Sequence, residues 1–317
     1  MKIVLLEPLG ISKEKTEKMA EPFVKSGHRF VPYYTLAADE TEQLERIKDA
    51  DAVIMANHPL SDDVIRECEK LKYISVAFVG IDHIGRKACE AKGIHVSNAA
   101  GYCDDAVAEL TVGLAMDCLR NISAVNGIIR QGGTKDGLVG HELRGRTVGV
   151  IGTGRIGQAA ARLFRALGCS LLGYSRTVRQ DAEEAGIRYV SLDELLAQSD
   201  IVTIHTPLTD ETKNLLSKEK IALMKESAIL VNTSRGPVVD NAALAEALNE
   251  GRLAGAGIDV FDGEPPLQAD YPLLHARNAV CTPHVGFATV ESIDRRAEIV
   301  FDNVDKWMKG ILQNRTL

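Results

Sequence analysis

The chain has 317 residues, which suits two domains of roughly 100–200 residues each. Hydrophobic residues make up 45% and charged residues 26%, a composition typical of globular proteins that excludes collagen-like, disordered and membrane-spanning chains. Lys and Arg number 37 and Asp and Glu 44, so the net charge is −7. This acidic balance provides no general field to attract phosphate backbones or anionic lipid, and we expect neither nucleic acid nor a membrane as partner.

Strand-length apolar runs alternate with helical segments along the chain. In the first hundred residues these runs are Lys2–Leu6, Arg29–Tyr33, Ala52–Met55, Tyr73–Phe78 and Ile94–Val96. A second set comprises Thr147–Ile151, Ser170–Tyr174, Arg188–Val190, Ile201–His205, Ala228–Asn232, Gly255–Val260 and Ala279–Cys281. This alternation predicts two α/β domains, each with a doubly wound, Rossmann-like parallel sheet.

Two longer helical patterns lie outside this alternation. The pattern Asp104–Arg130 begins with two acids and ends just before Gly132, as helix termini prefer, and we interpret it as one helix connecting the two sheets. The residues that follow, Gln131–Arg146, contain five glycines and predict an extended loop. Near the end of the chain, the apolar residues of Glu291–Lys309 recur close to the helical period and predict a final helix.

The amino terminus and the cysteines indicate the compartment. The first apolar run, Ile3–Leu6, is shorter than the 7–15 residues of a secretory signal core, so we expect no export. Six cysteines show neither a C-x-x-C pair nor the spacing of metal ligands: Cys68, Cys89, Cys103, Cys118, Cys169 and Cys281. Free thiols, a cytoplasmic location and no metal site are therefore expected.

A glycine-rich turn follows the strand run Thr147–Ile151. Gly152, Gly154 and Gly157 have the spacing G-x-G-x-x-G and open an alanine-rich helical segment. The first glycine permits a tight turn, the second lets the backbone approach a pyrophosphate, and the third allows close packing of helix on strand. Because strand, turn and helix are all in the required order, the segment predicts a dinucleotide site.

The end of the next strand run indicates which nicotinamide nucleotide is preferred. An acid there would accept a hydrogen bond from a ribose 2′-hydroxyl, but the sequence has Ser175, Arg176 and Thr177 instead, with Arg179 nearby. A hydroxyl and guanidinium groups can bind a 2′-phosphate, so NADP(H) is favoured. A single guanidinium also tolerates NAD(H), and the alternative interpretation is that both arginines are solvated loop charges.

Three later segments each follow a predicted strand and contain a residue type common in catalysis. They place Arg235, Glu264 and His284 after the runs ending at Asn232, Val260 and Cys281. In an open parallel sheet, ligands bind at the carboxyl edge, where these side chains would converge. Taken singly, a lone arginine is usually solvated and a lone histidine is usually structural.

Together with the glycine turn, these segments resemble the D-isomer-specific 2-hydroxyacid dehydrogenase family over almost the whole chain. Further matching segments are Val79–Ile84, Ala106–Leu110 and His205–Leu208. The resemblance implies a discontinuous substrate domain, residues 1–99 and 287–317, and an NAD(P)-binding domain, residues 100–286, with a cleft between them. It also implies a homodimer formed through the cofactor domains.

The resemblance assigns catalytic roles to matching positions. Arg235 would bind the substrate carboxylate, a task that suits a planar fork of donors. His284 would donate a proton to the substrate carbonyl, and histidine suits proton transfer because its ordinary pKa, about 6.5, lies near neutral pH. Glu264 would bind the other ring nitrogen and favour the imidazolium. Backbone amides near Val79 and Gly80 would complete the binding of the carboxylate.

The resemblance and the glycine turn together give a set of cofactor-binding residues. Arg155 and Ile156 would contact the pyrophosphate, Thr206 and Pro207 the adenosine side, Thr233 and Arg235 the nicotinamide ribose, Asp259 the carboxamide, and Gly286 the ring. The full expected set is Gly152, Thr153, Gly154, Arg155, Ile156, Gly157, Ser175, Arg176, Thr177, His205, Thr206, Pro207, Thr212, Thr233, Ser234, Arg235, Asp259, His284 and Gly286.

The function that the resemblance implies is NAD(P)-dependent reduction of a small 2-oxoacid, glyoxylate or hydroxypyruvate first, to the D-2-hydroxyacid. Formate dehydrogenases share this fold but carry glutamine where Glu264 stands, which argues against that branch. Two alternatives stay open. One is a phosphoglycerate dehydrogenase-like enzyme, and the other is a non-catalytic, nicotinamide-sensing protein like the C-terminal-binding corepressors.

Overall fold

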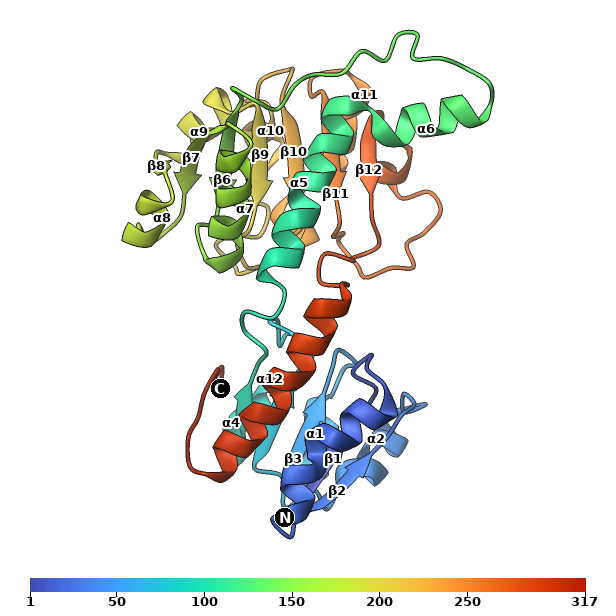
Figure 1. The fold of residues 1–317 in the computed structure, drawn as a ribbon, viewed down its shortest axis with the longest axis vertical. Helices are drawn as coiled ribbons and strands as arrows, with labels where there is room; N and C mark the ends of the chain where they lie inside the picture. The colour runs from blue at the N-terminus through green and yellow to red at the C-terminus, as the bar shows by residue number, and fades with distance from the viewer. The chain divides into compact units, whose positions relative to one another are not determined.

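The computed structural model describes residues 1–317 and divides the chain into two compact units, each an α/β structure (Figure 1). Unit 1 comprises Met1–Tyr102 and Ala288–Leu317, and unit 2 comprises Cys103–Phe287. These boundaries lie three residues and one residue from those expected from the sequence, 99/100 and 286/287. None of the helices combines the length and the apolar character that crossing a membrane requires.

Unit 1 is built on a five-stranded parallel sheet of order β2-β1-β3-β4-β5. Its elements are β1 (Lys2–Leu5), α1 (Lys13–Lys25), β2 (Arg29–Pro32), α2 (Glu40–Ile47), β3 (Ala52–Met55), α3 (Asp62–Glu67), β4 (Tyr73–Val76), α4 (Arg86–Lys92), β5 (His95–Ser97) and α12 (Val290–Met308).

The final helix of the chain, α12, packs on the first sheet, which makes unit 1 discontinuous in sequence. The rings of Trp307 and Tyr73 stack with their centroids 4.8 Å apart. On the same helix, the buried Asn303 donates a hydrogen bond from Nδ2 to the carbonyl oxygen of Asn98, 2.9 Å away. Stacking buries a large apolar area, and the hydrogen bond satisfies polar groups that would otherwise be costly to bury.

Unit 2 is built on a seven-stranded parallel sheet of order β12-β11-β10-β9-β6-β7-β8. Its elements are α5 (Asp104–Arg120), α6 (Ile122–Arg130), β6 (Thr147–Ile151), α7 (Arg155–Ala166), β7 (Ser170–Tyr174), α8 (Gln180–Glu184), β8 (Ile187–Tyr189), α9 (Leu192–Gln198), β9 (Ile201–Ile204), α10 (Lys218–Ile221), β10 (Ile229–Asn232), the 3-10 turn η1 (Gly236–Val238), α11 (Asn241–Asn249), β11 (Gly255–Ile258), the 3-10 turn η2 (Pro272–His275) and β12 (Ala279–Cys281).

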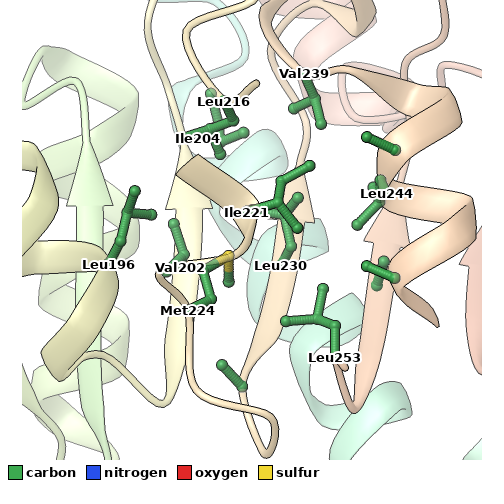
Figure 2. Packing of buried hydrophobic residues seen from close by; sticks show 14 of the residues in the cluster. Leu196, Val202, Ile204, Leu216, Ile221, Met224, Leu230, Val239, Leu244 and Leu253 are labelled. Atoms are coloured by element: carbon green, nitrogen blue, oxygen red, sulfur yellow. The ribbon is translucent and has the colours of Figure 1, made fainter. Parts of the chain in front are cut away.

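Side chains of successive residues in the central strands of unit 2 point to opposite faces of the sheet. Val202 of β9 and Leu230 of β10 face one apolar cluster, and their neighbours Ile201 and Ile229 face another. The first cluster lies under helices α9, α10 and α11 (Figure 2) and includes Leu196, Ile204, Leu216, Ile221, Met224, Val239, Leu244 and Leu253. Burial on both faces explains why these strands are continuously apolar in sequence.

The expected long helix over 104–130 is broken into two helices. Asn121 adopts a left-handed conformation with φ 53°, which ends α5 before α6 begins. Asparagine tolerates this conformation better than most side chains, and Asp117 accepts hydrogen bonds from the backbone N and Oγ of Ser123 just beyond the break. The prediction of one connecting helix was therefore wrong. Helix α5 packs on α7, β10 and β11 and belongs to unit 2.

The strand order sets where a ligand can bind in unit 2. From β6 the chain moves outward to β7 and β8, and it then returns to the other side of β6 through β9, β10, β11 and β12. The loops that leave the carboxyl ends of β6 and β9 therefore diverge to opposite sides of the sheet. Such a switch point is where doubly wound sheets bind nucleotides.

Candidate active site

The glycine turn lies between β6 and α7, and its three glycines are required for different reasons. Gly152 has φ +90°, and a Cβ on it would lie 2.7 Å from the carbonyl of His205. A Cβ on Gly157 would lie 2.0 Å from the carbonyl oxygen of Gly152. Gly154, by contrast, has nothing within 4 Å of where its Cβ would be. The outer glycines thus permit close backbone packing, while Gly154 leaves open space above the turn.

The amino end of α7 is suited to an anion. Its N-cap residue is Gly154, which has no side chain to accept from the backbone amides of the first turn, and that turn contains no acid. These amides and the helix dipole favour negative charge at this end of a 12-residue helix. Open space at Gly154 and uncapped amides together fit the pyrophosphate of a dinucleotide.

His205 follows β9 and lies against the glycine turn. Its backbone N donates to the carbonyl oxygen of Ile151, at 2.7 Å, while both ring nitrogens are buried without a hydrogen-bond partner. Burial lowers the pKa of His205 to about 4, so the imidazole is neutral at neutral pH. A neutral ring has one donor and one acceptor, and no hydrogen bond within the protein uses either of them.

Two side chains expected at the cofactor are engaged elsewhere. The buried Thr153 shares a hydrogen bond of 2.6 Å with the hydroxyl of Tyr189. Arg155 donates from Nε to Asp104 at the start of α5, at 2.7 Å. The backbone of both residues belongs to the turn, whereas their side chains tie the turn to β8 and α5.

The rim of the site on the β7 side contains the residues expected to distinguish the two nucleotides. Ser175 is half-buried, whereas Arg176 and Thr177 are exposed. Arg176 donates from Nη1 to Oε2 of Glu211, at 2.9 Å, and Glu211 lies in the loop after β9. In that same loop the hydroxyl of Thr212 donates to the carbonyl oxygen of Pro207, at 2.6 Å. No residue of the sequence pattern indicated that Glu211 meets Arg176.

Arg235 follows β10 in a turn that buried polar groups hold in place. Asn232, fully buried, donates from Nδ2 to the carbonyl oxygen of Arg235, at 3.0 Å, and accepts at Oδ1 from the backbone N of Ser234, at 3.1 Å. Thr233 shares a hydrogen bond of 2.9 Å with Thr111 of α5. The turn is thereby held both to its own strand and to the neighbouring helix.

His284 and Glu264 are in direct contact. Nδ1 of His284 lies 2.8 Å from Oε2 of Glu264, and the side chains are 24% and 67% exposed. The ring of Phe287 meets the imidazole edge to face at a centroid distance of 5.9 Å. A carboxylate on one ring nitrogen orients the imidazole and leaves the other to exchange a proton.

The backbone of His284 is strained, and Asp259 holds it. His284 has φ 55°, an uncommon conformation for a residue other than glycine, and its backbone N donates to the carbonyl oxygen of Asp259, at 2.9 Å. The buried carboxylate of Asp259 accepts from Thr282 Oγ1 at 2.6 Å and from the backbone N of Val285 and of Gly286, both at 2.8 Å. Asp259 therefore organises the loop that contains His284.

A second polar network connects the segments of Arg235 and Glu264, and no sequence motif indicated it. Asp262 accepts from Nδ2 of the buried Asn241, at 2.8 Å, and from the hydroxyl of Tyr271, at 2.9 Å. Asn241 begins the helix that follows the Arg235 turn, and a Cβ on Gly236 would lie 1.9 Å from the carbonyl oxygen of Phe261. The two segments therefore pack backbone to backbone.

Strand order brings the three expected catalytic residues to neighbouring positions. Arg235 follows β10, Glu264 follows β11 and His284 follows β12, and these strands are adjacent in the sheet. Val79 and Gly80 belong to unit 1, at the carboxyl end of β4, where Asn98 donates from Nδ2 to the carbonyl oxygen of Val79, at 2.8 Å.

Comparison with known proteins decides the family. Residues 112–286 match the NAD binding domain of the D-isomer specific 2-hydroxyacid dehydrogenases. A glyoxylate reductase of Korarchaeum cryptofilum is 39% identical over 84% of this chain and 82% of its own length. The chain belongs to the D-isomer specific 2-hydroxyacid dehydrogenase family.

Two further dehydrogenases extend the likeness to the whole chain. A D-3-phosphoglycerate dehydrogenase of Methanocaldococcus jannaschii is 39% identical over 98% of this chain, which spans 58% of that protein. A glyoxylate reductase structure from Paecilomyes thermophila superposes with a TM-score of 0.89 at 28% identity and covers 100% of this chain and 98% of that one. As a family member, the protein is an oxidoreductase that acts on the CH–OH group of 2-hydroxyacids and uses a nicotinamide cofactor.

The glycine turn of this dehydrogenase allows a matched pair of substitutions. Gly154→Ala should leave the free energy of unfolding within about 1 kcal/mol, because its Cβ meets open space and its φ of −73° suits alanine. It should nevertheless weaken nicotinamide nucleotide binding, since the methyl group occupies the space assigned to the pyrophosphate. Gly157→Ala should destabilise the fold by more than 2 kcal/mol, about the cost of overpacking a core position. Urea unfolding and nucleotide titration would measure both, and unimpaired binding by Gly154→Ala would contradict this assignment.

Proposed function

We propose that the protein reduces a small 2-oxoacid, glyoxylate or hydroxypyruvate first, to the D-2-hydroxyacid, with His284 as the proton donor. The observation that carries the proposal is the 2.8 Å contact between Nδ1 of His284 and Oε2 of Glu264. These residues follow β12 and β11, which lie in order beside β10, the strand that precedes Arg235. Relatives named glyoxylate reductase support the choice of substrate.

Each residue of the site has a separate role in the proposed reaction. Arg235 binds the substrate carboxylate, because a planar fork of donors can hold both oxygens and fix the direction of the neighbouring carbonyl. His284 protonates the carbonyl oxygen from Nε2 and takes the proton back in oxidation. Glu264 stabilises the imidazolium through Nδ1 and keeps the ring in one orientation. When bound, the nicotinamide supplies or accepts the hydride. Amides near Val79 and Gly80 of unit 1 provide further ligands for the carboxylate.

NADP(H) is the cofactor we propose over NAD(H). After β7 the chain has Ser175, Arg176 and Thr177, with no acid to accept from a ribose 2′-hydroxyl or to repel a 2′-phosphate. A guanidinium gives charge-assisted hydrogen bonds to a phosphate, which are about twice as strong as neutral ones. His205, Thr206, Pro207 and Thr212 form the opposite side of the adenosine site in this proposal.

A phosphoglycerate dehydrogenase-like activity is the second candidate, favoured by the 39% identity to such an enzyme over nearly the whole chain. A non-catalytic nicotinamide sensor is the third. A measurable turnover would exclude the non-catalytic sensor. Activity with a phosphorylated hydroxyacid would distinguish the two enzymes from each other. We also propose a cytoplasmic location, since six free thiols, five of them buried, suit a reducing compartment.

The central experiment measures initial rates for a panel of 2-oxoacids and for 3-phosphoglycerate, each with both nucleotides. Wild-type protein should reduce glyoxylate or hydroxypyruvate faster than it oxidises 3-phosphoglycerate. His284→Ala should lower kcat by about 10²–10⁴, the usual worth of a positioned general acid, and leave nucleotide affinity nearly intact. A His284→Ala variant with wild-type turnover would exclude this residue as the proton donor.

The contact between His284 and Glu264 makes a prediction about turnover. Glu264→Gln replaces the carboxylate 2.8 Å from Nδ1 of His284 by a neutral amide and removes a charge-assisted hydrogen bond. Such a bond is worth about 1.5–3 kcal/mol, so kcat for reduction should fall by about 10–100-fold while nucleotide affinity stays nearly unchanged. Glu226→Gln, the same charge change before β10 at the amino ends of the strands, is the control. A Glu264→Gln variant with wild-type kcat would contradict the pairing.

We further propose a homodimer formed through α6 and the segment that follows it. Helix α6 projects from the rest of unit 2 (Figure 1), and none of its residues is buried although four are Ile or Val. Ile129 is 65% exposed and Val139 78%. Beside them lies a hollow of about 860 Å³, lined in part by Ile122, Val125 and Leu138. An amphipathic helix with an exposed apolar face and an adjoining hollow fits a second copy of the chain.

If this surface is the dimer interface, a charge introduced into it should produce a monomer. Ile129→Lys should shift the protein from dimer to monomer, because a buried unpaired ammonium is costly at an apolar interface. Val24→Lys is a matched control, since Val24 is also an exposed apolar residue, 57% exposed, but lies on α1 of unit 1. Sedimentation velocity would measure both variants. An Ile129→Lys protein that sediments like the wild-type dimer would rule out this surface.

A further inference from the structure

The ion pair between Arg176 and Glu211 joins two loops on either side of the glycine turn. Arg176 follows β7 and Glu211 follows β9, and these strands flank β6, whose carboxyl end leads into the turn. Nη1 of Arg176 and Oε2 of Glu211 are 2.9 Å apart. The only carboxylate in contact with this guanidinium therefore comes from a loop 35 residues away in sequence.

Glu211 is presented from an ordered turn. The hydroxyl of Thr212 accepts from the backbone N of Thr209, at 2.7 Å, and donates to the carbonyl oxygen of Pro207, at 2.6 Å. The backbone N of Lys213 donates to the carbonyl oxygen of Thr209, at 2.8 Å. Glu211 lies between Thr212 and the acid Asp210, so its position follows from this turn, which limits how far its carboxylate can move away from Arg176.

We propose that Glu211 is a specificity-determining residue that competes with the ribose 2′-phosphate of NADP(H) for Arg176. The inference rests on the proposed function, which assigns Arg176 to the 2′ position of the nucleotide. A 2′-phosphate must displace the carboxylate or share the guanidinium with it, and two anions at one cation repel each other. The 2′-hydroxyl of NAD(H) is uncharged and need not displace the carboxylate, so NAD(H) leaves the ion pair intact. Glu211 thereby lowers the preference for NADP(H) and lets the enzyme accept both nucleotides.

The expected size of the effect is modest. The side chains of Arg176 and Glu211 are 82% and 71% exposed, so water and salt screen their attraction. A guanidinium also has five donors and can bind two anions at once. From the usual strength of an exposed ion pair, releasing Arg176 should tighten NADPH binding by about 2–5-fold.

The test compares dissociation constants of NADPH and NADH, titrated at one ionic strength, for three neutralising variants. Glu211→Gln should tighten NADPH by about 2–5-fold and leave NADH nearly unchanged. Asp210→Asn removes the same charge from the adjacent residue, which makes no ion pair, and should have a smaller effect. Glu226→Gln should have no effect on either dissociation constant, because Glu226 precedes β10 and lies at the amino ends of the strands. An unchanged NADPH-to-NADH ratio in Glu211→Gln, or an equal effect of Asp210→Asn, would overturn the proposal.

A double-mutant cycle separates competition from simple repulsion. Arg176→Ala should weaken NADPH by roughly 10–100-fold and leave NADH nearly unchanged. In that background Glu211→Gln should tighten NADPH by less than about 2-fold, because no guanidinium remains to be released. A gain that persists in full would show that Glu211 acts on the phosphate directly, and the competition would be wrong.

Failure of the proposed function gives a different result from failure of this inference. The titrations need no turnover, so a protein that binds both nucleotides but reduces no 2-oxoacid overturns only the proposed substrate. If Arg176→Ala weakens NADPH and NADH binding equally, the assignment of Arg176 to the 2′ position is wrong. The proposed role of Glu211 is then wrong as well. Raising the salt concentration should shrink the gain from Glu211→Gln, which a purely structural effect of the substitution would not show.

Discussion

Parallel pairing of strands is the constraint on which the rest of unit 2 depends. It places the carboxyl ends of all seven strands at one edge of the sheet, so residues far apart in sequence emerge side by side. Arg235, Glu264 and His284 follow three adjacent strands, and the glycine turn and His205 follow another adjacent pair. Parallel pairing also requires helices on both faces, which is why Ile201 and Val202 of one strand are both fully buried.

Local strain in the site is balanced by buried hydrogen bonds. The left-handed backbone of His284 costs about 1–3 kcal/mol and persists only where its surroundings determine it. Asp259 fixes this backbone conformation, because its carboxylate is almost fully buried and accepts hydrogen bonds from one hydroxyl and two backbone amides. A buried carboxylate with satisfied acceptors is tolerated, whereas an unpaired one would not be. The same residue therefore stabilises the fold and aims the imidazole.

The interior and the rim of the site differ in how strongly they are fixed. Asn232, Asn241 and Asp259 are each no more than 5% exposed, and their hydrogen bonds connect the loops that contain the catalytic residues. Arg176 and Glu211 at the rim are mostly exposed and interact through a screened contact. Rigid support thus surrounds the proposed proton transfer, while the contacts proposed to choose between nucleotides lie where a small energy change alters preference without disturbing the fold.

Features that depend on neighbouring residues could be predicted from the sequence. The apolar run Thr147–Ile151 became β6 with the same bounds, and the spacing of Gly152, Gly154 and Gly157 indicated a turn whose glycines the structure requires for packing and for open space. Periodicity and glycine spacing are local properties, so they can be read without knowing the fold. The same local reading failed at Asn121, because a helical pattern does not show which asparagine adopts a left-handed conformation.

Which side chains contact each other could not be predicted from the sequence and follows from the folded arrangement of the strands. The burial of Thr153 against Tyr189, the unpartnered ring of His205, the network of Asn241, Asp262 and Tyr271, and the ion pair of Arg176 with Glu211 all join separate strands or loops. Their partners are set by the strand order β9-β6-β7 and β12-β11-β10 and by the shapes of the loops between. Sequence patterns report spacing along the chain, whereas these contacts depend on distances across the sheet.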